Sequence, residues 1–242
     1  MDELKIEQQD GIWLLKMNRP TRHNALNTAL TQALLQALED ANQAASCRAV
    51  VLAGEGPSFC SGADTSEFRG FGEHPEGALA RADLTMRVHQ IFSTLAKPVV
   101  AAIHGNALGG GAGLAVACDM VIAESGTRFG YPELKHGICP AIVMANLTRQ
   151  LGQKHAFELV STGRLLSGRE MESWGLANSC LDGEAQVLQA ALDVARKWAS
   201  YSRHAVGATK RLFYRCVDLS LTEGLECGRD TNVMMRTFPR DQ

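Results

Sequence analysis

Short, continuous apolar runs alternate with helix-patterned segments along the first two-thirds of the chain, and this alternation restricts the fold more than any other feature. The runs at 48–53 and 99–103 are of the kind that is buried on both faces of a sheet, and 119–123 is a further strand. Between them, apolar residues recur at helical spacing, which predicts helices at 28–44 and 79–95. Alternation of this kind predicts a parallel sheet with right-handed crossovers.

The two ends of the chain have different patterns. Strands at 4–8 and 12–17, joined at an Asp-Gly turn, predict a hairpin at the N-terminus. The C-terminal third is almost entirely helical in pattern. We expect a helical turn at 65–68, a loop at 70–77 and another at 104–111, helices at 111–117, 141–150, 153–161, 168–174, 184–200, 204–218 and 221–236, and a short strand at 176–181.

Composition excludes several classes of function. The 242 residues carry a formal net charge of −2, so there is no electrostatic case for nucleic-acid binding. Seven cysteines, an odd number with no CxxC pair, argue against a disulfide framework and a structural zinc site. The histidines show no ligand spacing, so no metal is expected. Without a signal-peptide pattern or a membrane-length apolar run, a cytoplasmic protein is the default expectation.

Two glycine-rich segments follow buried strands and are the strongest candidates for a site. In GEGPSFCSGAD, Gly62 allows the backbone to turn closely around a ligand at the carboxyl end of a strand. In HGNALGGGAGL, three consecutive glycines precede a helix of small residues. The first turn of a helix offers unpaired N–H groups and a positive dipole end, which suit a negative charge developing on oxygen. An ordinary turn and close helix packing are the structural alternatives.

Five segments in this order resemble the crotonase (enoyl-CoA hydratase/isomerase) superfamily. NRPTRHNALN is similar to its NRPxxxNAL signature, and SFCSGAD is similar to [AS]FCAGAD. HGNALGGGAGLAVACDMVIA is similar to GxALGGGxxLAxxCDxxIA, and TRFGYPELKHGICP to AxFGxPExxxGxxP. STGRLLSGREMESWGLAN resembles TGxxxxAxEAxxxGLV. The combination covers nearly the whole chain and is highly specific, although no single segment would suffice.

The resemblance implies an acyl-CoA thioester substrate whose carbonyl oxygen accepts two backbone N–H bonds. By motif, these donors are Ala63 and Gly110, and Glu133 of the FGxPE segment is the acid–base residue. Removing or adding a proton at the thioester α-carbon passes through an enolate, and two aimed N–H groups stabilise that charge. Burial would raise the pKa of Glu133 and suit it to proton transfer.

The second glutamate of typical hydratases is absent. Its position, three residues after the central glycine of the GGG segment, is Gly113. Hydration calls for one group to deprotonate water and one to protonate the α-carbon, although a single carboxylate could do both in turn. Double-bond isomerisation needs only one base. The aspartate of the dienoyl isomerases is also absent, because Ala141 occupies its position. A replacement base could come from the 70–77 loop, which contains Glu73, His74 and Glu76.

Contacts with the CoA moiety are implied at positions flanking the first two motifs. Arg22 stands where family members often hold a basic residue near the phosphates. Ala25 and Leu26 lie on the backbone that lines the nucleotide, and Asp64 and Thr65 follow the first oxyanion donor. Each of these residues could instead serve only to form a turn.

The resemblance also implies an architecture: a crotonase (ClpP-like) α/β spiral of repeated ββα units with a C-terminal helical region. We place the core with the acyl-CoA site at 1–182 and the helical region at 183–242, with a role in trimerisation and in covering the CoA. The chain stops at RTFPRDQ, about where the family's covering helix would begin, so this cover is expected to be shortened. A homotrimer or hexamer is the expected assembly.

These observations predict an acyl-CoA-processing enzyme, foremost an enoyl-CoA hydratase, with no metal or redox cofactor because CoA is part of the substrate. The first alternative is a 3-enoyl-CoA to 2-enoyl-CoA isomerase that uses Glu133 alone. A different class of alternative is a catalytically weak acyl-CoA-binding protein, against which the retention of Glu133 counts. A serine hydrolase on the related protease fold lacks a nucleophile motif.

Overall fold

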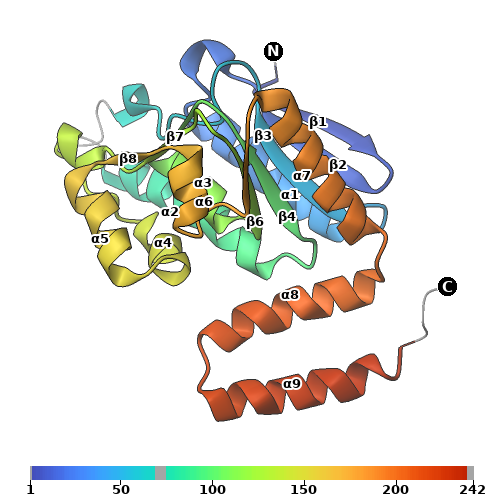
Figure 1. The fold of residues 1–242 in the computed structure, drawn as a ribbon. Coiled ribbons are helices and arrows are strands. Elements are labelled where there is room, and N and C mark those ends of the chain that lie inside the picture. The colour runs from blue at the N-terminus through green and yellow to red at the C-terminus, as the bar shows by residue number, and fades with distance from the viewer. Residues whose placement is uncertain (1, 69–74, 239–242) are drawn as a thin grey trace.

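A six-stranded sheet runs through the centre of the protein (Figure 1). The computed structural model describes residues 2–68 and 75–238. Strand order is β1-β2-β3-β4-β6-β9, with β1 antiparallel to β2 and every other neighbouring pair parallel. The strands are β1 (Leu4–Gln9), β2 (Ile12–Met17), β3 (Ala49–Gly54), β4 (Val99–Ile103), β6 (Met120–Glu124) and β9 (Ser179–Leu181). The predicted hairpin and parallel sheet are therefore confirmed.

A second, three-stranded sheet was not predicted. It consists of β5 (Asn106–Leu108), β7 (Arg128–Gly130) and β8 (Leu165–Leu166) in the order β5-β7-β8. The expectation of a loop through 104–111 is wrong at residues 106–108, which pair in parallel with β7. Strands of two or three residues are too short to show an alternating pattern, so their pairing depends on contacts that only the folded chain supplies.

The helices follow the predicted periodicity closely. They are α1 (Thr28–Gln43), α2 (Pro75–Thr94), α3 (Gly110–Ala117), α4 (Met144–Gln150), α5 (Gln153–Thr162), α6 (Gly168–Ser173), α7 (Glu184–Ala199), α8 (Arg203–Val217) and α9 (Leu221–Met235). Three short 3₁₀ turns are η1 (Pro20–Arg22), η2 (Thr65–Phe68) and η3 (Glu133–His136). Helix α2 begins four residues before the predicted start at 79, because a proline fits the first turn of a helix, where its missing N–H has no intrahelical partner.

The central strands are buried on both faces, as their continuous apolar sequence predicts. Every residue of β3 and β4 is buried. Since side chains alternate along a strand, Val50 packs into the core shared with α1. Val51 packs into a smaller core on the opposite face, with Val187 and Ala191 of α7. Helix α7, the first of the region assigned to 183–242, thus covers one face of the sheet (Figure 1).

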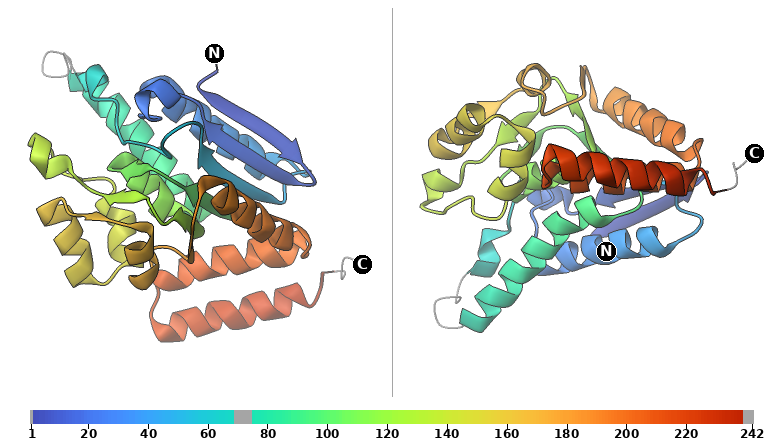
Figure 2. Two further views of the ribbon diagram at one scale, coloured as in Figure 1. Left: turned by 45° about the horizontal axis from the view of Figure 1, so that its top comes forward. Right: turned by 90° about the horizontal axis from the view of Figure 1, so that it is seen from below.

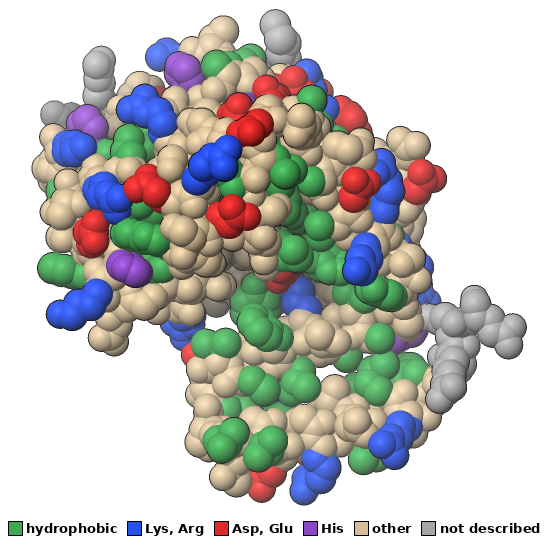
Figure 3. Space-filling view, viewed as in Figure 1, with side chains coloured by type: hydrophobic (Ala, Val, Ile, Leu, Met, Phe, Trp, Pro, Cys, Tyr) green, Lys and Arg blue, Asp and Glu red, His purple; other side chains and the backbone are tan. Residues whose placement is uncertain are grey.

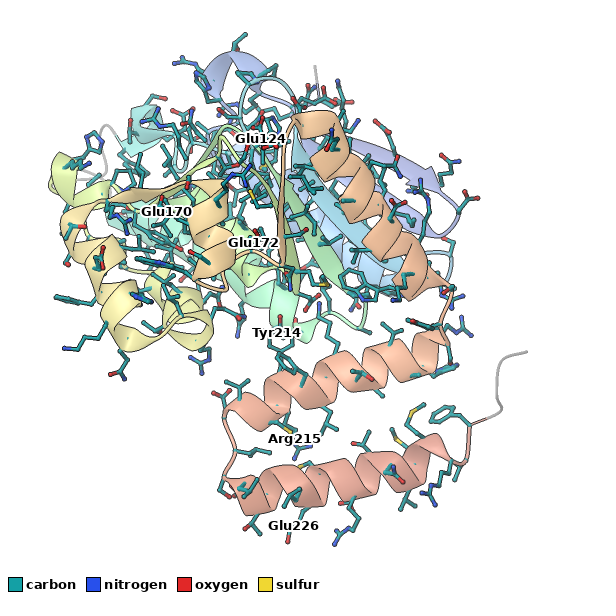
Figure 4. All side chains as sticks on the ribbon, in the orientation of Figure 1. Glu124, Glu170, Glu172, Tyr214, Arg215 and Glu226 are labelled. Carbon is teal, nitrogen blue, oxygen red and sulfur yellow. The ribbon has the colours of Figure 1, made fainter. Side chains whose placement is uncertain are left out.

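Helices α8 and α9 lie side by side away from the central sheet, as two views show (Figures 1 and 2). A partly buried polar cluster connects α8 to the body. The Lys210 ammonium lies 2.7 Å from Asp119 Oδ2, and the Tyr214 hydroxyl donates to Asp119 Oδ1 at 2.8 Å. The side chain of Tyr214 points from α8 toward the body of the protein (Figure 4). The same carboxylate accepts the Val99 N–H at 2.6 Å, and Lys210 also donates to the Lys97 carbonyl. One carboxylate therefore joins α8 to the start of β4, beside the start of β6.

We expect Asp119→Ala to lower the free energy of unfolding by about 3–5 kcal/mol, because it leaves a buried ammonium without its partner. The Lys210 side chain is only 5% exposed. Asp182→Ala is the control: it breaks an ion pair with Arg169 in which both side chains are more than 70% exposed, and should change stability by no more than about 1 kcal/mol. Chemical denaturation of both variants tests the difference, and equal losses would contradict the assignment.

Hydrophobic side chains gather on the surfaces of α8 and α9 (Figure 3). Helix α9 buries none of its residues. The exposed apolar side chains of the two helices are Phe213, Val217, Leu221, Leu225, Val233 and Met234. Over residues 2–68 and 75–238, we find no helix whose length and hydropathy would allow it to cross a bilayer.

Candidate active site

The loop after β3 is held against the segment before α1 by a short parallel bridge. Leu26 donates its N–H to the Gly62 carbonyl at 2.7 Å and accepts the N–H of Asp64 at 3.0 Å. Ala63 lies between Gly62 and Asp64 in the chain. In a parallel pairing of this kind, its N–H points away from Leu26. It makes no hydrogen bond to the described part of the chain. The fold therefore leaves the first predicted donor available.

The second predicted donor lies beside it. Gly110 is the first residue of α3, where a helix leaves its N–H groups unpaired. A β-carbon on Gly110 would lie 3.8 Å from the Ala63 nitrogen, and one on Gly62 would lie 3.5 Å from the Gly110 nitrogen. Glycine at these positions lets the two backbones approach closely. The result is a pair of adjacent N–H groups at the positive end of a helix.

Glu133 reaches the same place from the small sheet. It is the first residue of η3, shortly after β7. Gly109 donates its N–H to the Gly130 carbonyl at 2.9 Å, which ties β7 to the start of α3. A β-carbon on Gly109 would lie 2.9 Å from Glu133 Oε1, and Gly109 has φ +52°, in the left-handed region that favours glycine. The carboxyl group thus rests against the residue before Gly110.

The Glu133 side chain is partly buried, and its hydrogen bonding is incomplete. Burial raises the pKa of Glu133, and a hydrogen bond from its own backbone and the charge of His136 partly oppose this. Oε2 is buried without a hydrogen-bond partner among the described residues, and so is the hydroxyl of Tyr131. Burial, followed by the charge of Glu133, raises the pKa of Tyr131. A buried carboxyl oxygen without a partner carries a desolvation penalty that a bound ligand or water can relieve.

No side chain could project from position 113 without displacing its neighbours. A β-carbon on Gly113 would lie 2.6 Å from Val143 Cγ1 and 2.7 Å from His89 Nε2. The space in which the second glutamate of typical hydratases would begin is therefore filled by a valine of the segment before α4 and an imidazole of α2.

Within the described residues, no group of three or more His, Cys, Asp or Glu is arranged to hold a metal ion.

Comparison with known proteins places this geometry in a family. Residues 7–240 match the family model described as enoyl-CoA hydratase/isomerase. This chain belongs to the enoyl-CoA hydratase/isomerase family. A probable enoyl-CoA hydratase of Rhizobium meliloti is 36% identical over 94% of this chain and 87% of the relative. The 2,3-dehydroadipyl-CoA hydratase of Escherichia coli is 33% identical, with 93% and 87% covered.

Solved structures of the family confirm the predicted crotonase fold. The crystal structure of an enoyl-CoA hydratase from Mycobacterium smegmatis superposes with a TM-score of 0.91 at 29% identity, covering 98% of this chain and 92% of the other. One from Bacillus anthracis gives 0.90 at 30% identity, covering 95% and 89%. The resemblance inferred from five motifs therefore extends to nearly the whole chain.

The predicted CoA-contacting residues lie around the bridge between Leu26 and Ala63. Leu26 is buried, and its Cδ1 would lie 3.2 Å from a β-carbon on Gly110. Arg22 is exposed at the end of η1, and Thr65 is exposed at the start of η2. The carbonyl of Ala25 and the carboxylate of Asp64 are both bound by Arg19, and Asp64 also accepts from Ser66. The hydrogen bond from Ser66, with that from Arg19, lowers the pKa of Asp64.

The replacement bases considered for the 70–77 loop have different outcomes. Glu73 and His74 lie outside the described residues. Glu76 is exposed in the first turn of α2, on a segment that was expected to be loop and is helix from residue 75.

Sequence reasoning missed three residues that support the site. Arg19 holds Ala25 and Asp64 together, and its position in the NRP segment was the available signal. Arg81 of α2 is 8% exposed and donates to the Leu26 carbonyl at 2.8 Å. His89, also on α2, contacts the Gly110 carbonyl at 3.3 Å. In the sequence, Arg81 and His89 are recognisable only as polar residues beside the apolar stripe of α2.

Proposed function

We propose that this protein is a 2-enoyl-CoA hydratase in which Ala63 and Gly110 bind the thioester carbonyl oxygen and Glu133 is the acid–base residue. The observation that carries the proposal is the convergence of three elements. Two unpaired, adjacent N–H groups lie next to a buried carboxyl oxygen that has no partner within the described chain. The names of the hydratase relatives support the same substrate class.

The arrangement suits addition of water to a double bond conjugated to a thioester. As an oxygen nucleophile bonds to the β-carbon, negative charge moves to the carbonyl oxygen and forms an enolate. The N–H groups of Ala63 and Gly110 stabilise this charge without reorganising, since both are fixed by the backbone. Glu133 in its protonated form, which burial favours by raising the pKa, then delivers a proton to the α-carbon.

Double-bond isomerisation is the second candidate, and Gly113 is the observation that favours it. Movement of a proton between the α- and γ-carbons needs one base and one oxyanion hole. Glu133 is the carboxylate beside the two N–H groups, and position 113 has neither a carboxylate nor room for one. The isomerase reading uses Glu133 first as a carboxylate that removes a proton.

Contacts with CoA are part of the proposal. The exposed guanidinium of Arg22 would face the phosphates, and the backbone at Ala25 and Leu26, with Asp64 and Thr65, would line the nucleotide. Because Arg19 and Ser66 bind the Asp64 carboxylate, its proposed contribution is to hold this backbone. CoA enters as part of the substrate, with no further cofactor. A homotrimer or hexamer acting in the cytoplasm, with residues 183–242 in assembly and cover, stays a prediction.

Product analysis in heavy water tests the proposal. The protein is incubated with a panel of 2-enoyl-CoA and 3-enoyl-CoA thioesters. Formation of 3-hydroxyacyl-CoA deuterated at the α-carbon is expected. Conversion of 3-enoyl-CoA to 2-enoyl-CoA without hydration would replace the proposal by the isomerase reading. Binding of acyl-CoA without any reaction would favour the binding-protein class instead.

The pH dependence of turnover separates the two enzyme readings by its sign. The pKa of Glu133 is raised by burial. If the protonated carboxyl donates to the α-carbon, kcat/KM for hydration falls as the pH rises through that pKa. If the carboxylate removes a proton, as in isomerisation, kcat/KM rises through the same pKa. We expect the falling limb for 2-enoyl-CoA, measured as a pH–rate profile under subsaturating substrate.

A further inference from the structure

The bridge that directs the Ala63 N–H is a single residue pair outside the two sheets. Leu26 donates to the Gly62 carbonyl at 2.7 Å and accepts the Asp64 N–H at 3.0 Å, and its pairing with Ala63 lies outside the named strands. Within a sheet, further pairs on either side repeat this pattern and fix the direction of each N–H. An isolated pair depends on other contacts for the same precision.

The guanidinium of Arg81, on α2, makes such a contact. Its Nη2 donates to the Leu26 carbonyl at 2.8 Å, so this oxygen accepts one bond from Asp64 and one from Arg81. Nη2 also lies 3.3 Å from the Thr31 hydroxyl, and Nη1 donates to the Thr85 hydroxyl. Arg81 is buried. Because a charged donor binds a carbonyl more strongly than a neutral one, and burial keeps water from competing, Arg81 should hold the Leu26 carbonyl firmly.

The carboxylate of Glu67 connects the same guanidinium to the turn that follows Ala63. Glu67 lies in η2, and its N–H donates to the Asp64 carbonyl at 3.1 Å. Its carboxylate accepts the N–H and the hydroxyl of Thr28, both at 2.9 Å, at the start of α1. Oε2 also lies 3.5 Å from Arg81 Nε as an ion pair. Helices α1 and α2 and the loop that carries Ala63 therefore meet at this pair of charges.

We propose that Arg81 is a positioning residue for the first oxyanion donor: through the Leu26 carbonyl, it keeps the Ala63 N–H directed at the thioester oxygen. The proposal rests on the function proposed above, which places that oxygen between Ala63 and Gly110. Arg81 transfers no proton and contributes no donor of its own to the oxygen. It matters because an N–H stabilises charge only at hydrogen-bonding distance and in line with the oxygen, and a small displacement weakens it steeply.

Two substitutions of Arg81 test the proposal. Arg81→Met keeps an apolar stem and removes every donor. Arg81→Lys keeps the charge, but one nitrogen cannot reproduce the fork that binds the Leu26 carbonyl and the Glu67 carboxylate together. We expect kcat for 2-enoyl-CoA to fall about 10–100-fold in Arg81→Met and by a smaller factor in Arg81→Lys. Affinity for a saturated acyl-CoA should stay close to that of wild type, because the oxygen carries less charge in the ground state.

The infrared stretching frequency of the thioester carbonyl reports on the oxyanion hole without requiring turnover, since hydrogen bonds to a carbonyl oxygen lower it. With a saturated acyl-CoA that is isotope-labelled at this carbonyl, binding to wild type should lower the frequency. Arg81→Met should lose part of this shift. Arg87→Met is the matched control, because Arg87 lies on the same helix but is exposed and pairs with Glu39 at 3.4 Å. It should keep the wild-type shift and kcat.

The double variant Arg81→Met/Ala63→Pro decides whether Arg81 acts through the Ala63 N–H. If it does, Arg81→Met should change kcat less than about twofold in the proline background, because the donor that it positions is already gone. Thermal unfolding shows which variants are folded, and Arg81→Lys serves for the same comparison if the methionine variant is not.

An Arg81 variant with the wild-type kcat and carbonyl shift overturns the proposal. So does a full loss of kcat on Arg81→Met in the proline background, which assigns Arg81 a general structural role. A wild-type protein that shows the carbonyl shift but hydrates no 2-enoyl-CoA refutes the hydratase function instead, and the shift in the variants still decides the role of Arg81.

Discussion

Glu133→Gln is expected to lower turnover of the enoyl-CoA substrate about 10²–10⁴-fold, the range that a positioned acid–base group contributes. Glutamine keeps the shape of the side chain against Gly109 but can neither donate nor accept a proton at the α-carbon. Because the carboxyl is buried with an unpartnered oxygen, the amide should leave stability unchanged or slightly higher. The loss should therefore appear in kcat, with acyl-CoA affinity retained.

Steady-state kinetics, together with calorimetric titration of a saturated acyl-CoA, measures the two quantities separately. Glu226→Gln is the control, since Glu226 is exposed on α9, far from the small sheet (Figure 4). Its kinetics should equal those of wild type. Turnover that persists in the Glu133 variant would remove this carboxyl from the mechanism, whichever of the two reactions the wild type catalyses.

Ala63→Pro is expected to lower kcat about 10²–10³-fold, as the removal of one oxyanion donor does in other enzymes. Proline lacks the backbone N–H, and in this protein the Ala63 N–H has no partner in the described chain that would be lost with it. The bridge through Leu26 uses the Gly62 carbonyl and the Asp64 N–H, so it can persist in the variant. The substitution should weaken stabilisation of the transition state, in which the charge on the oxygen is greatest.

Ala63→Ser is the matched control for this substitution, because it changes the exposed side chain and keeps the donor. It should retain most of the wild-type kcat. Thermal unfolding of both variants shows whether the loop has kept its structure. A folded proline variant with wild-type kcat would exclude the Ala63 N–H as an oxyanion donor.

Much of the fold could be predicted because long elements carry their own periodicity. The apolar stripes of α1 and α7 and the continuous runs of β3 and β4 fixed their type and their approximate bounds. The small sheet could not be found in this way. β8 has two residues, and its partner Gly130 is recognisable as a strand residue only through its pairings with Leu108 and Leu165. Such pairings arise from the packing of distant segments.

The candidate site likewise contains residues that could be predicted from the sequence and residues that could not. Ala63, Gly110 and Glu133 belong to motifs that are local in sequence, and the fold brings all three together. His89 could not be assigned from the sequence, because its meaning depends on the packing of α2 against α3. A histidine near an apolar stripe is ordinary, and a glycine in a small-residue helix is ordinary. Only their separation of 2.7 Å, from Nε2 to a β-carbon on Gly113, connects them.

Helix α9 and the central sheet of the single chain differ in the free energy needed to open them. It contributes no buried residue, and its contacts within the chain are mainly with α8. Local opening of such a segment exposes little additional apolar surface, so its opening free energy lies far below that of the sheet. In an isolated chain, the amide hydrogens of α9 should therefore exchange with solvent through subglobal openings. Those of β3 and β4 should exchange only when the whole chain unfolds. The last helix is thus a separate cooperative unit, and its order can respond to binding events that leave the sheet unaffected.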